Sequence, residues 1–179
     1  MNKIETIKLG EIAEFRNGLN FAKENSIGTG CKMLGVADFK NNIFPKYEEL
    51  EEINPIDIVK DDDYLKFEDI VFVRSNGNKD LVGRSIYINK DTKLTYSGFC
   101  IRLRLNNTKI NPLFLYYYTK SKSFKNSIST SSGTNIQNLN QKILADVDIP
   151  LFNQKIQNKI TNIIYSIDLK IELNNKINK

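Results

Sequence analysis

The sequence contains no histidine, and this absence excludes several classes of catalytic site. Ser–His and Cys–His nucleophilic centres, zinc sites with a histidine ligand and HExxH metalloproteases all depend on that residue. Only two cysteines are present, too few for a disulfide framework or a cysteine-rich zinc site. We expect Cys31 and Cys100 to be small core residues in a reducing compartment. Any acid–base chemistry would have to use carboxylates, lysine or tyrosine, so the composition favours binding over catalysis.

Long apolar segments are equally scarce. The sequence has no run of eighteen apolar residues and no basic segment followed by an apolar leader. We therefore expect a cytoplasmic protein that neither spans a membrane nor is exported. A P-loop is absent, and Gly28-Thr29-Gly30 lacks the third glycine and the following helix of a dinucleotide-binding turn. The 179 residues, 40% of them hydrophobic, suffice for one domain with an appendage.

Charge is distributed unevenly along the chain. The net charge is +5, but the segment from Glu48 to Asp69 holds ten acids and two lysines, a net of −8 that leaves +13 on the rest of the chain. A protein with such a separation can bind phosphates on one side and direct its acids away from them. A solvated acidic loop on an ordinary basic protein explains the same pattern equally well.

Short apolar runs between turn residues predict several strands. An apolar stretch at 7–15 ends at Arg16-Asn17-Gly18, where Asn–Gly predicts a turn because both residues tolerate positive φ. A further strand is expected over 31–39. Ile70–Val73 and residues 82–88 read as a hairpin whose tip, 74–80, is polar and basic.

Alternation is clearest over residues 99–105. Its apolar residues, Phe99 among them, are expected on a buried face, and the opposite face is expected to be exposed and cationic. Arg102 and Arg104 on that face would be phosphate contacts or merely solvated. Asn111 and Pro112 then provide an N-cap and a first helical residue, so a helix is expected from Pro112 onward.

The last segment predicts a long helix with its own interface. After Asn153, a plausible cap, apolar and asparagine residues recur at heptad spacing. The seam consists of Ile160, Ile164, Ile167, Ile171, Asn174 and Asn178. A helix of about 25 residues reaches roughly 37 Å, longer than a compact domain requires. We expect residues 151–179 to form a coiled-coil-type helix outside a mixed-sheet α+β domain at 1–150. The alternative is that this helix packs on its own sheet.

One catalytic alternative is a metal-dependent nuclease. Asp69 followed by Asp91-Thr92-Lys93 loosely resembles an acidic residue plus Asp-x-Lys, which binds Mg²⁺ and positions a lysine near the attacking water. Asp91 and Lys93 fall in a predicted turn, however, where the chemistry needs a strand. We therefore expect no metal site and no enzymatic activity.

Several short motifs occur in an order and spacing that resemble a known family. They are residues 9–12 and the turn at 17–18, residues 68–75 and 82–84, residues 97–99, residues 111–117, residues 132–139, and residues 149–151 leading into 167–172. In this order they resemble the DNA-specificity (S) subunits of type I restriction-modification systems. A full S subunit has two target-recognition domains and two spacer helices, whereas this chain has one of each. A natural half-subunit, a truncated product and an excised piece all fit this difference.

The resemblance implies a role in recognition without catalysis or cofactor. Family members read a bipartite site in double-stranded DNA and carry the methyltransferase (M) subunit and, through it, the restriction (R) subunit. If the chain is complete, two copies would pair antiparallel through the helical seam as a homodimer and read an inverted repeat. The rival interpretation is an interaction module or defunct half-subunit that binds the methyltransferase without DNA specificity.

We expect the DNA contacts to come from polar loops. Arginine and lysine can read guanine, and asparagine or glutamine can read adenine, whereas lysines on helices more often neutralise phosphates. The expected base-contacting residues are Arg16, Asn17, Asn20, Arg74, Asn76, Asn78, Lys79, Ser132, Thr134, Asn135 and Gln137. The expected phosphate contacts are Lys120, Lys122 and Lys125.

Overall fold

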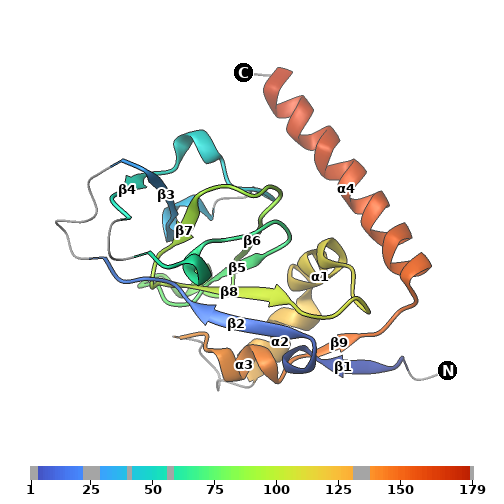
Figure 1. The fold of residues 1–179 in the computed structure, drawn as a ribbon. Helices are drawn as coiled ribbons and strands as arrows, with labels where there is room; N and C mark the ends of the chain where they lie inside the picture. Colours follow the sequence, from blue (N-terminus) through green and yellow to red (C-terminus); the bar gives the residue numbers. More distant parts are fainter. Residues whose placement is uncertain (1–3, 22–28, 40–41, 56–58, 131–137, 178–179) are drawn as a thin grey trace.

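A computed structural model describes residues 4–21, 29–39, 42–55, 59–130 and 138–177 of the chain. Its centre is a four-stranded antiparallel sheet in the order β2-β8-β5-β6. These strands are β2 (Ala13–Asn17), β8 (Cys100–Leu105), β5 (Ile70–Val73) and β6 (Ser85–Tyr87). The predicted hairpin is confirmed as β5 and β6, and the expected α+β class is confirmed as well (Figure 1).

A second, three-stranded sheet lies against the first. Its order is β4-β3-β7, with β4 (Glu52–Ile53) antiparallel and β7 (Leu94–Tyr96) parallel to β3 (Cys31–Leu34). The strand expected over 31–39 therefore ends early. The side chain of Asp38 accepts a hydrogen bond from the Gly35 N–H at 2.7 Å and closes a 3-10 turn instead.

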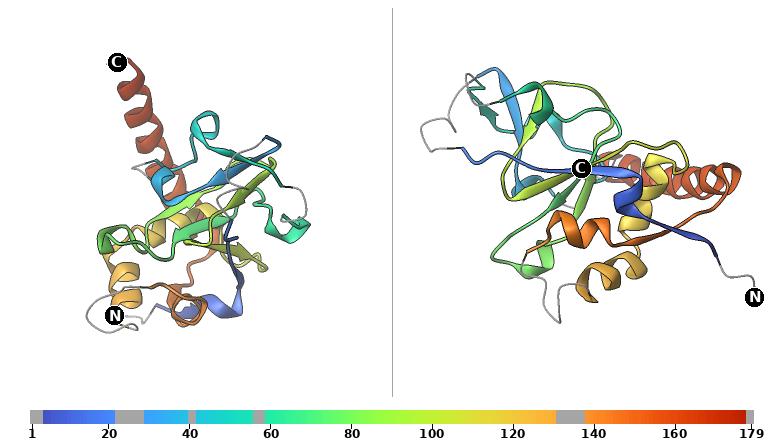
Figure 2. Two further views of the ribbon diagram at one scale, coloured as in Figure 1. Left: turned by 90° about the vertical axis from the view of Figure 1, so that its left-hand side faces the viewer. Right: turned by 60° about the horizontal axis from the view of Figure 1, so that its bottom comes forward.

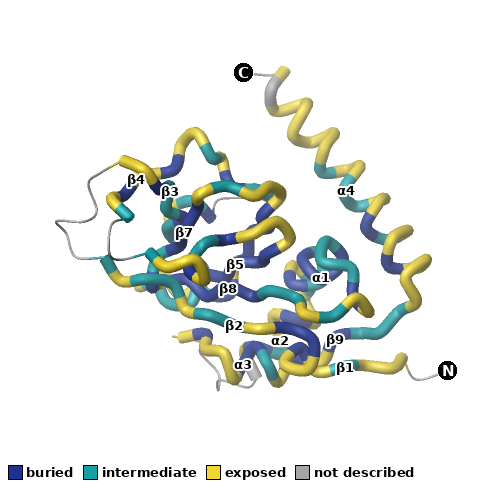
Figure 3. Tube along the Cα trace, in the orientation of Figure 1, coloured by how far each residue is buried: buried dark blue, intermediate teal, exposed yellow. Residues whose placement is uncertain are grey.

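The central sheet is buried on both faces. Because side chains alternate along a strand, Ile70 and Phe72 of β5 enter one apolar core while Val71 and Val73 enter another. The first core lies under three helices, α1 (Pro112–Thr119), α2 (Lys122–Thr130) and α3 (Gln141–Ala145). The second core is shared with the three-stranded sheet. Figure 3 shows the buried residues concentrated along these strands.

The prediction of an exposed cationic face on β8 is wrong. Arg102 is 4% exposed, and its Nη1 donates to the Asp62 carbonyl at 3.1 Å. Arg104 donates from Nε and Nη2 to the two carboxylate oxygens of Asp69, each at 2.7 Å. The acidic segment and the second sheet cover this face. Oxygens of Asp62, Tyr64 and Asp69 accept hydrogen bonds from the two guanidinium groups, and the buried Nε of Arg102 has no acceptor among the described residues.

The predicted helix caps at Asn111 and Asn153 are confirmed. Asn111 accepts from the Phe114 N–H at 3.0 Å at the start of α1, and Asn153 accepts from the Ile156 N–H at 3.0 Å at the start of α4 (Gln154–Ile177). The chain reaches α4 through β9 (Asp148–Pro150). This strand pairs antiparallel with β1 (Thr6–Lys8), so the beginning and the end of the globular part lie side by side.

Helix α4 packs on the globule through its N-terminal part, up to about Asp168. Gln157 is fully buried and accepts from the Asn111 N–H at 2.7 Å, while its Nε2 donates to the carbonyls of Lys109 and Phe152. Further along, Tyr165 meets the ring of Phe44 edge-on. The last turns project away from the rest of the chain in Figure 1 and in the left view of Figure 2. In the part of the chain that the structure describes, none of the helices combines the length and apolar character needed to span a membrane.

Candidate nucleic-acid interface

The turn after β2 lies directly on the segment that precedes β8. Leu19 donates its N–H to the Tyr96 carbonyl at 2.9 Å, and Gly98 donates to the Leu19 carbonyl at 2.6 Å. Neither Asn17 nor Gly18 has the positive φ that the Asn–Gly pattern predicts. Gly18 is required for a different reason: a Cβ at this position would overlap the carbonyl oxygens of Tyr96 and Ser97.

The hairpin tip joins the same segment. The Phe99 carbonyl accepts from the N–H groups of Arg74 and Ser75 at 2.8 and 3.3 Å. Ser75 also forms an isolated antiparallel bridge with Asn138, and the Leu139 N–H donates to the Arg74 carbonyl at 2.8 Å. Residues 17–20, 74–79, 97–99 and 138 therefore form one surface, which we call the loop cluster.

The predicted base-contacting residues in the loop cluster are accessible. Asn17, Asn20, Asn78 and Lys79 are exposed, and Asn76 is half-buried. The side-chain oxygen of Asn76 accepts from the Asn78 N–H at 2.8 Å, and that of Asn78 accepts from the Asp80 N–H at 3.0 Å. These bonds hold the tip in shape and leave both amide NH₂ groups available as donors.

Arg74 is the most constrained side chain of the loop cluster. Its Nη1 lies 3.5 Å from the Gly98 carbonyl oxygen, and its Nε is buried without an acceptor among the described residues. A buried guanidinium donor is costly to leave unpaired. The arrangement therefore suits an acceptor that arrives from outside the described chain.

Arg16 has a structural partner that the sequence pattern did not indicate. Its Nε and Nη2 donate to one carboxylate oxygen of Asp63 at 2.9 and 2.6 Å, and Asp63 is only 3% exposed. The hydrogen bond to Asp63 raises the pKa of Arg16. Its expected base contact would compete with this ion pair. The other expected loop residues, Ser132, Thr134, Asn135 and Gln137, lie outside the described part of the chain.

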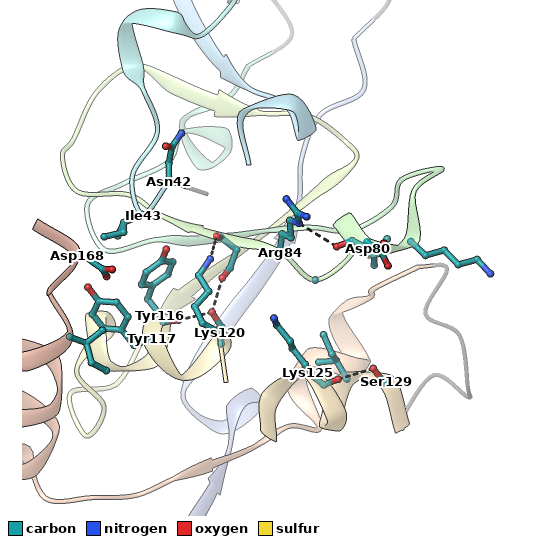
Figure 4. A pocket seen from close by; sticks show the side chains of 17 residues that line it. Asn42, Ile43, Asp80, Arg84, Tyr116, Tyr117, Lys120, Lys125, Ser129 and Asp168 are labelled. Atoms are coloured by element: carbon teal, nitrogen blue, oxygen red, sulfur yellow. Dashed lines mark hydrogen bonds between the residues drawn. The ribbon is translucent and has the colours of Figure 1, made fainter. Parts of the chain in front are cut away.

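A basic pocket lies beside the hairpin tip (Figure 4). This open cavity of about 760 Å³ is lined by Lys79, Arg84, Lys120 and Lys125, with Asp80 and Asp168 as its acids. Lys122, also expected to contact phosphate, is exposed on α2 and does not line the pocket.

Lys120 is held inside this pocket although much of the residue is exposed. Its Nζ donates to the Ser85 carbonyl at 2.5 Å and lies 4.7 Å from the centre of the Tyr116 ring. Burial, followed by the charges of Lys125 and Arg84, lowers the pKa of Lys120 to about 8. The cations of the pocket thus repel one another, and an anion between them would relieve that repulsion.

Asp69 and Asp91, the carboxylates considered as metal ligands of a nuclease, have other hydrogen-bond partners. Asp69 is fully buried and bonded through both oxygens to Arg104, and it also accepts from the Lys66 N–H at 2.7 Å. Asp91 accepts from the Phe67 N–H at 2.8 Å. Within the ranges that the structure describes, no three acids or cysteines come together as metal ligands would.

Helix α4 exposes only part of the expected seam. Ile160 and Ile164 of the expected seam are partly buried against the globule, Ile167, Ile171 and Asn174 are exposed, and Asn178 lies outside the described residues. Ile156 and Ile163, which lie on the same side of the helix as Ile167, are exposed to 42% and 55% and were not expected there. The outer stripe is Ile156, Ile163, Ile167 and Ile171. Leu169 and Leu173 are exposed on another side of the helix, and Ile177, two heptads beyond Ile163, is exposed next to the outer stripe.

Comparisons with known sequences identify relatives along the whole chain. A family model described as "Type I restriction modification DNA specificity domain" matches residues 1–179. The StySPI specificity subunit of Salmonella potsdam is 32% identical over 119 residues, and the EcoKI specificity subunit of Escherichia coli K12 is 31% identical over 119 residues. Each alignment covers 64% of this chain, but only 26% and 25% of the respective relatives, so the chain spans a fraction of their length.

Solved structures share the fold. A chain from a type I R-M system, described in terms of complex assembly and conformational transition, superposes with a TM-score of 0.70 at 17% identity, covering 99% of this chain and 41% of that one. The type I S subunit from M. genitalium gives 0.62 at 19% identity, covering 98% and 41%. Together with the match along the full sequence, these similarities confirm the resemblance predicted above. The chain belongs to the type I restriction-modification DNA specificity family.

Proposed function

We propose that this chain is a non-catalytic DNA reader that recognises one half of a bipartite duplex site and docks the methyltransferase subunit. Through that subunit it would also recruit the restriction subunit. The observation that carries the proposal is the convergence of the loop cluster. Residues 17–20 and 74–79, far apart in the sequence and both predicted to carry side chains able to read bases, lie on one surface with residues 97–99.

The loop cluster combines the donors that base recognition needs. Asn20, Asn76 and Asn78 present carboxamides, which can pair with the N6 and N7 atoms of adenine. Arg74 supplies a guanidinium whose Nε has no acceptor among the described residues. Because hydrogen bonds within the hairpin tip fix its shape, little conformational entropy would be lost when DNA binds.

The basic pocket supports a neighbouring phosphate contact. Lys79 belongs both to the loop cluster and to the lining of the pocket, so the two features are adjacent. Lys125 and Lys120 would neutralise the DNA backbone there while the loop cluster reads base edges. Phosphate contacts position a protein on the duplex, and base contacts specify the sequence.

The outer stripe of α4 supports pairing of two copies. Its four isoleucines are exposed, and a coiled coil buries such a seam. An antiparallel homodimer would place two identical loop clusters at its ends and read an inverted repeat. Leu169 and Leu173 then remain exposed for the methyltransferase.

The proposal is tested by selection from a pool of duplexes with a random region of about three helical turns, enough for two half-sites. We expect the wild-type chain, co-purified with its methyltransferase, to enrich one sequence with inverted symmetry. Arg74→Met should lose discrimination at one base pair, because its guanidinium is the candidate base contact. Lys125→Met should weaken binding to all duplexes alike. It should also reduce the slope of the logarithm of the binding constant against the logarithm of the salt concentration by about one.

A control and a rival outcome complete the experiment. Lys90→Met removes an exposed cation that lies over the Tyr47 ring, away from the loop cluster, and should leave the enriched sequence unchanged. Retained binding of the methyltransferase with no enriched sequence would contradict DNA reading. That result would favour the adaptor interpretation.

A further inference from the structure

Phe99 is an aromatic side chain that the fold places in solvent. The alternation of β8 predicts it on the buried face with Ile101, yet it is 59% exposed while Cys100 and Ile101 are completely buried. The strand begins at Cys100, and the chain bends just before it. The exposure therefore comes from the backbone path and not from a shortage of core space.

The backbone around Phe99 is fixed on both sides. Its carbonyl accepts from the N–H groups of Arg74 and Ser75, and its own N–H donates to the Ser97 Oγ at 3.3 Å. The N–H of the preceding Gly98 donates a hydrogen bond to the Leu19 carbonyl, and a Cβ on Gly98 would overlap the Asn20 side chain. The ring is thus displayed from a rigid position, which is how proteins present an aromatic anchor to a ligand.

The location separates Phe99 from ordinary exposed apolar residues. Single exposed hydrophobic residues are common on protein surfaces. Among the described residues, however, the other large exposed hydrophobics lie at Ile4, at Phe67 and along α4. Phe99 alone among these exposed hydrophobics stands inside the loop cluster.

The chemistry of the neighbouring side chains suggests what the ring would contact. The amides of Asn20, Asn76 and Asn78 suit adenine, and in the major groove an A·T pair presents the thymine C5-methyl group beside the adenine edge. An apolar ring beside such amides could make an apolar contact with that methyl group while the amides bind the adenine edge. We propose that Phe99 contacts the C5-methyl group of a thymine in the recognised half-site, an inference that rests on the proposed function.

Removal of single methyl groups from the DNA tests this contact. The probe is the duplex that the wild-type chain enriches from the random pool, with each thymine in turn replaced by deoxyuridine. We expect one replacement to weaken wild-type binding about fourfold, because it removes one buried methyl group from the contact. Phe99→Ala should bind the thymine and deoxyuridine duplexes equally, and Phe99→Leu should retain part of the difference.

A matched control and two negative results keep the outcomes distinct. Phe67→Ala removes another exposed ring, 51% accessible and outside the loop cluster, and should keep the full thymine preference. An unchanged preference in Phe99→Ala, or no sensitive thymine in the wild type, would overturn this inference alone. Failure of the wild-type chain to enrich any sequence would overturn the proposed function and this inference with it.

Discussion

Arg104 donates hydrogen bonds to both carboxylate oxygens of Asp69, and the Asp69 side chain is fully buried. The hydrogen bond to Asp69 also raises the pKa of Arg104. With the pair of Arg16 and Asp63, this contact attaches both ends of residues 61–69 to the central sheet. Part of the acidic segment is therefore internal structure rather than a solvated loop.

Loss of one member of this buried pair should destabilise the fold strongly. We expect Asp69→Asn to lower the free energy of unfolding by about 3–5 kcal/mol, because it leaves a partly buried guanidinium without its counter-charge. Urea denaturation followed by circular dichroism measures this. A double variant, Asp69→Leu with Arg104→Met, should recover most of the loss. Lys8→Met, which breaks an exposed pair with Asp148, should change stability by less than about 1 kcal/mol.

A methyl group at Gly18 should disturb the loop cluster. Gly18→Ala would force the turn after β2 away from the Tyr96 and Ser97 carbonyls, and we expect a loss of about 1–3 kcal/mol together with weaker DNA binding. Gly77→Ala is the matched control, since a methyl group at that position would have no neighbouring atom within 4 Å. Equal melting temperatures for the two variants would contradict this account of Gly18.

Lys120 should make stability depend on pH in the alkaline range. Its pKa is lowered to about 8 in the folded chain, whereas an unfolded lysine titrates near pH 10.4. Between these pH values Lys120 binds more protons in the unfolded chain than in the folded chain. The free energy of unfolding therefore increases with pH over this range.

Denaturation at a series of pH values between about 7.5 and 9.5 measures this dependence. We expect the rise in the wild type to be absent in Lys120→Met and present in Lys122→Met, which alters an exposed lysine two residues away on α2. Parallel pH profiles for the wild type and Lys120→Met would show that the ammonium group is not desolvated in the pocket.

A charge in the outer stripe of α4 should separate the proposed dimer. We expect Ile167→Asp to raise the dimer dissociation constant by roughly tenfold or more, because an unpaired carboxylate is costly to bury. Sedimentation velocity between micromolar and millimolar concentration measures it. Leu169→Asp, on the opposite side of the same helix, should leave self-association unchanged. If both variants behave alike, the outer stripe is not the dimer interface.

Local signals in the sequence predicted much of the fold. The caps at Asn111 and Asn153 and the hairpin of β5 and β6 depend on residues a few positions apart, and the structure confirms them. The loop cluster also includes six residues whose hydrogen-bonding groups marked them as candidates for base contacts, namely Asn17, Asn20, Arg74, Asn76, Asn78 and Lys79. These features follow from short-range geometry and side-chain chemistry, which a sequence shows directly.

Other features depend on partners distant in the sequence. Arg102 and Arg104 alternate with apolar residues and so indicated an exposed face, but oxygens of the acidic segment make their burial favourable. The side of α4 that meets the globule is set by Gln157, which bonds to Asn111 and Lys109, 46 and 48 residues earlier in the chain. No periodicity within a strand or a helix contains such information.

The pairing of β1 with β9 gives the globular part a single point of attachment. The Leu151 N–H donates to the Glu5 carbonyl at 2.8 Å, so the chain enters and leaves this unit at the base of α4. A unit joined in this way can be exchanged for a homologous one by two genetic crossovers that coincide in space. Recombination could then exchange the loop cluster while α4 remains constant.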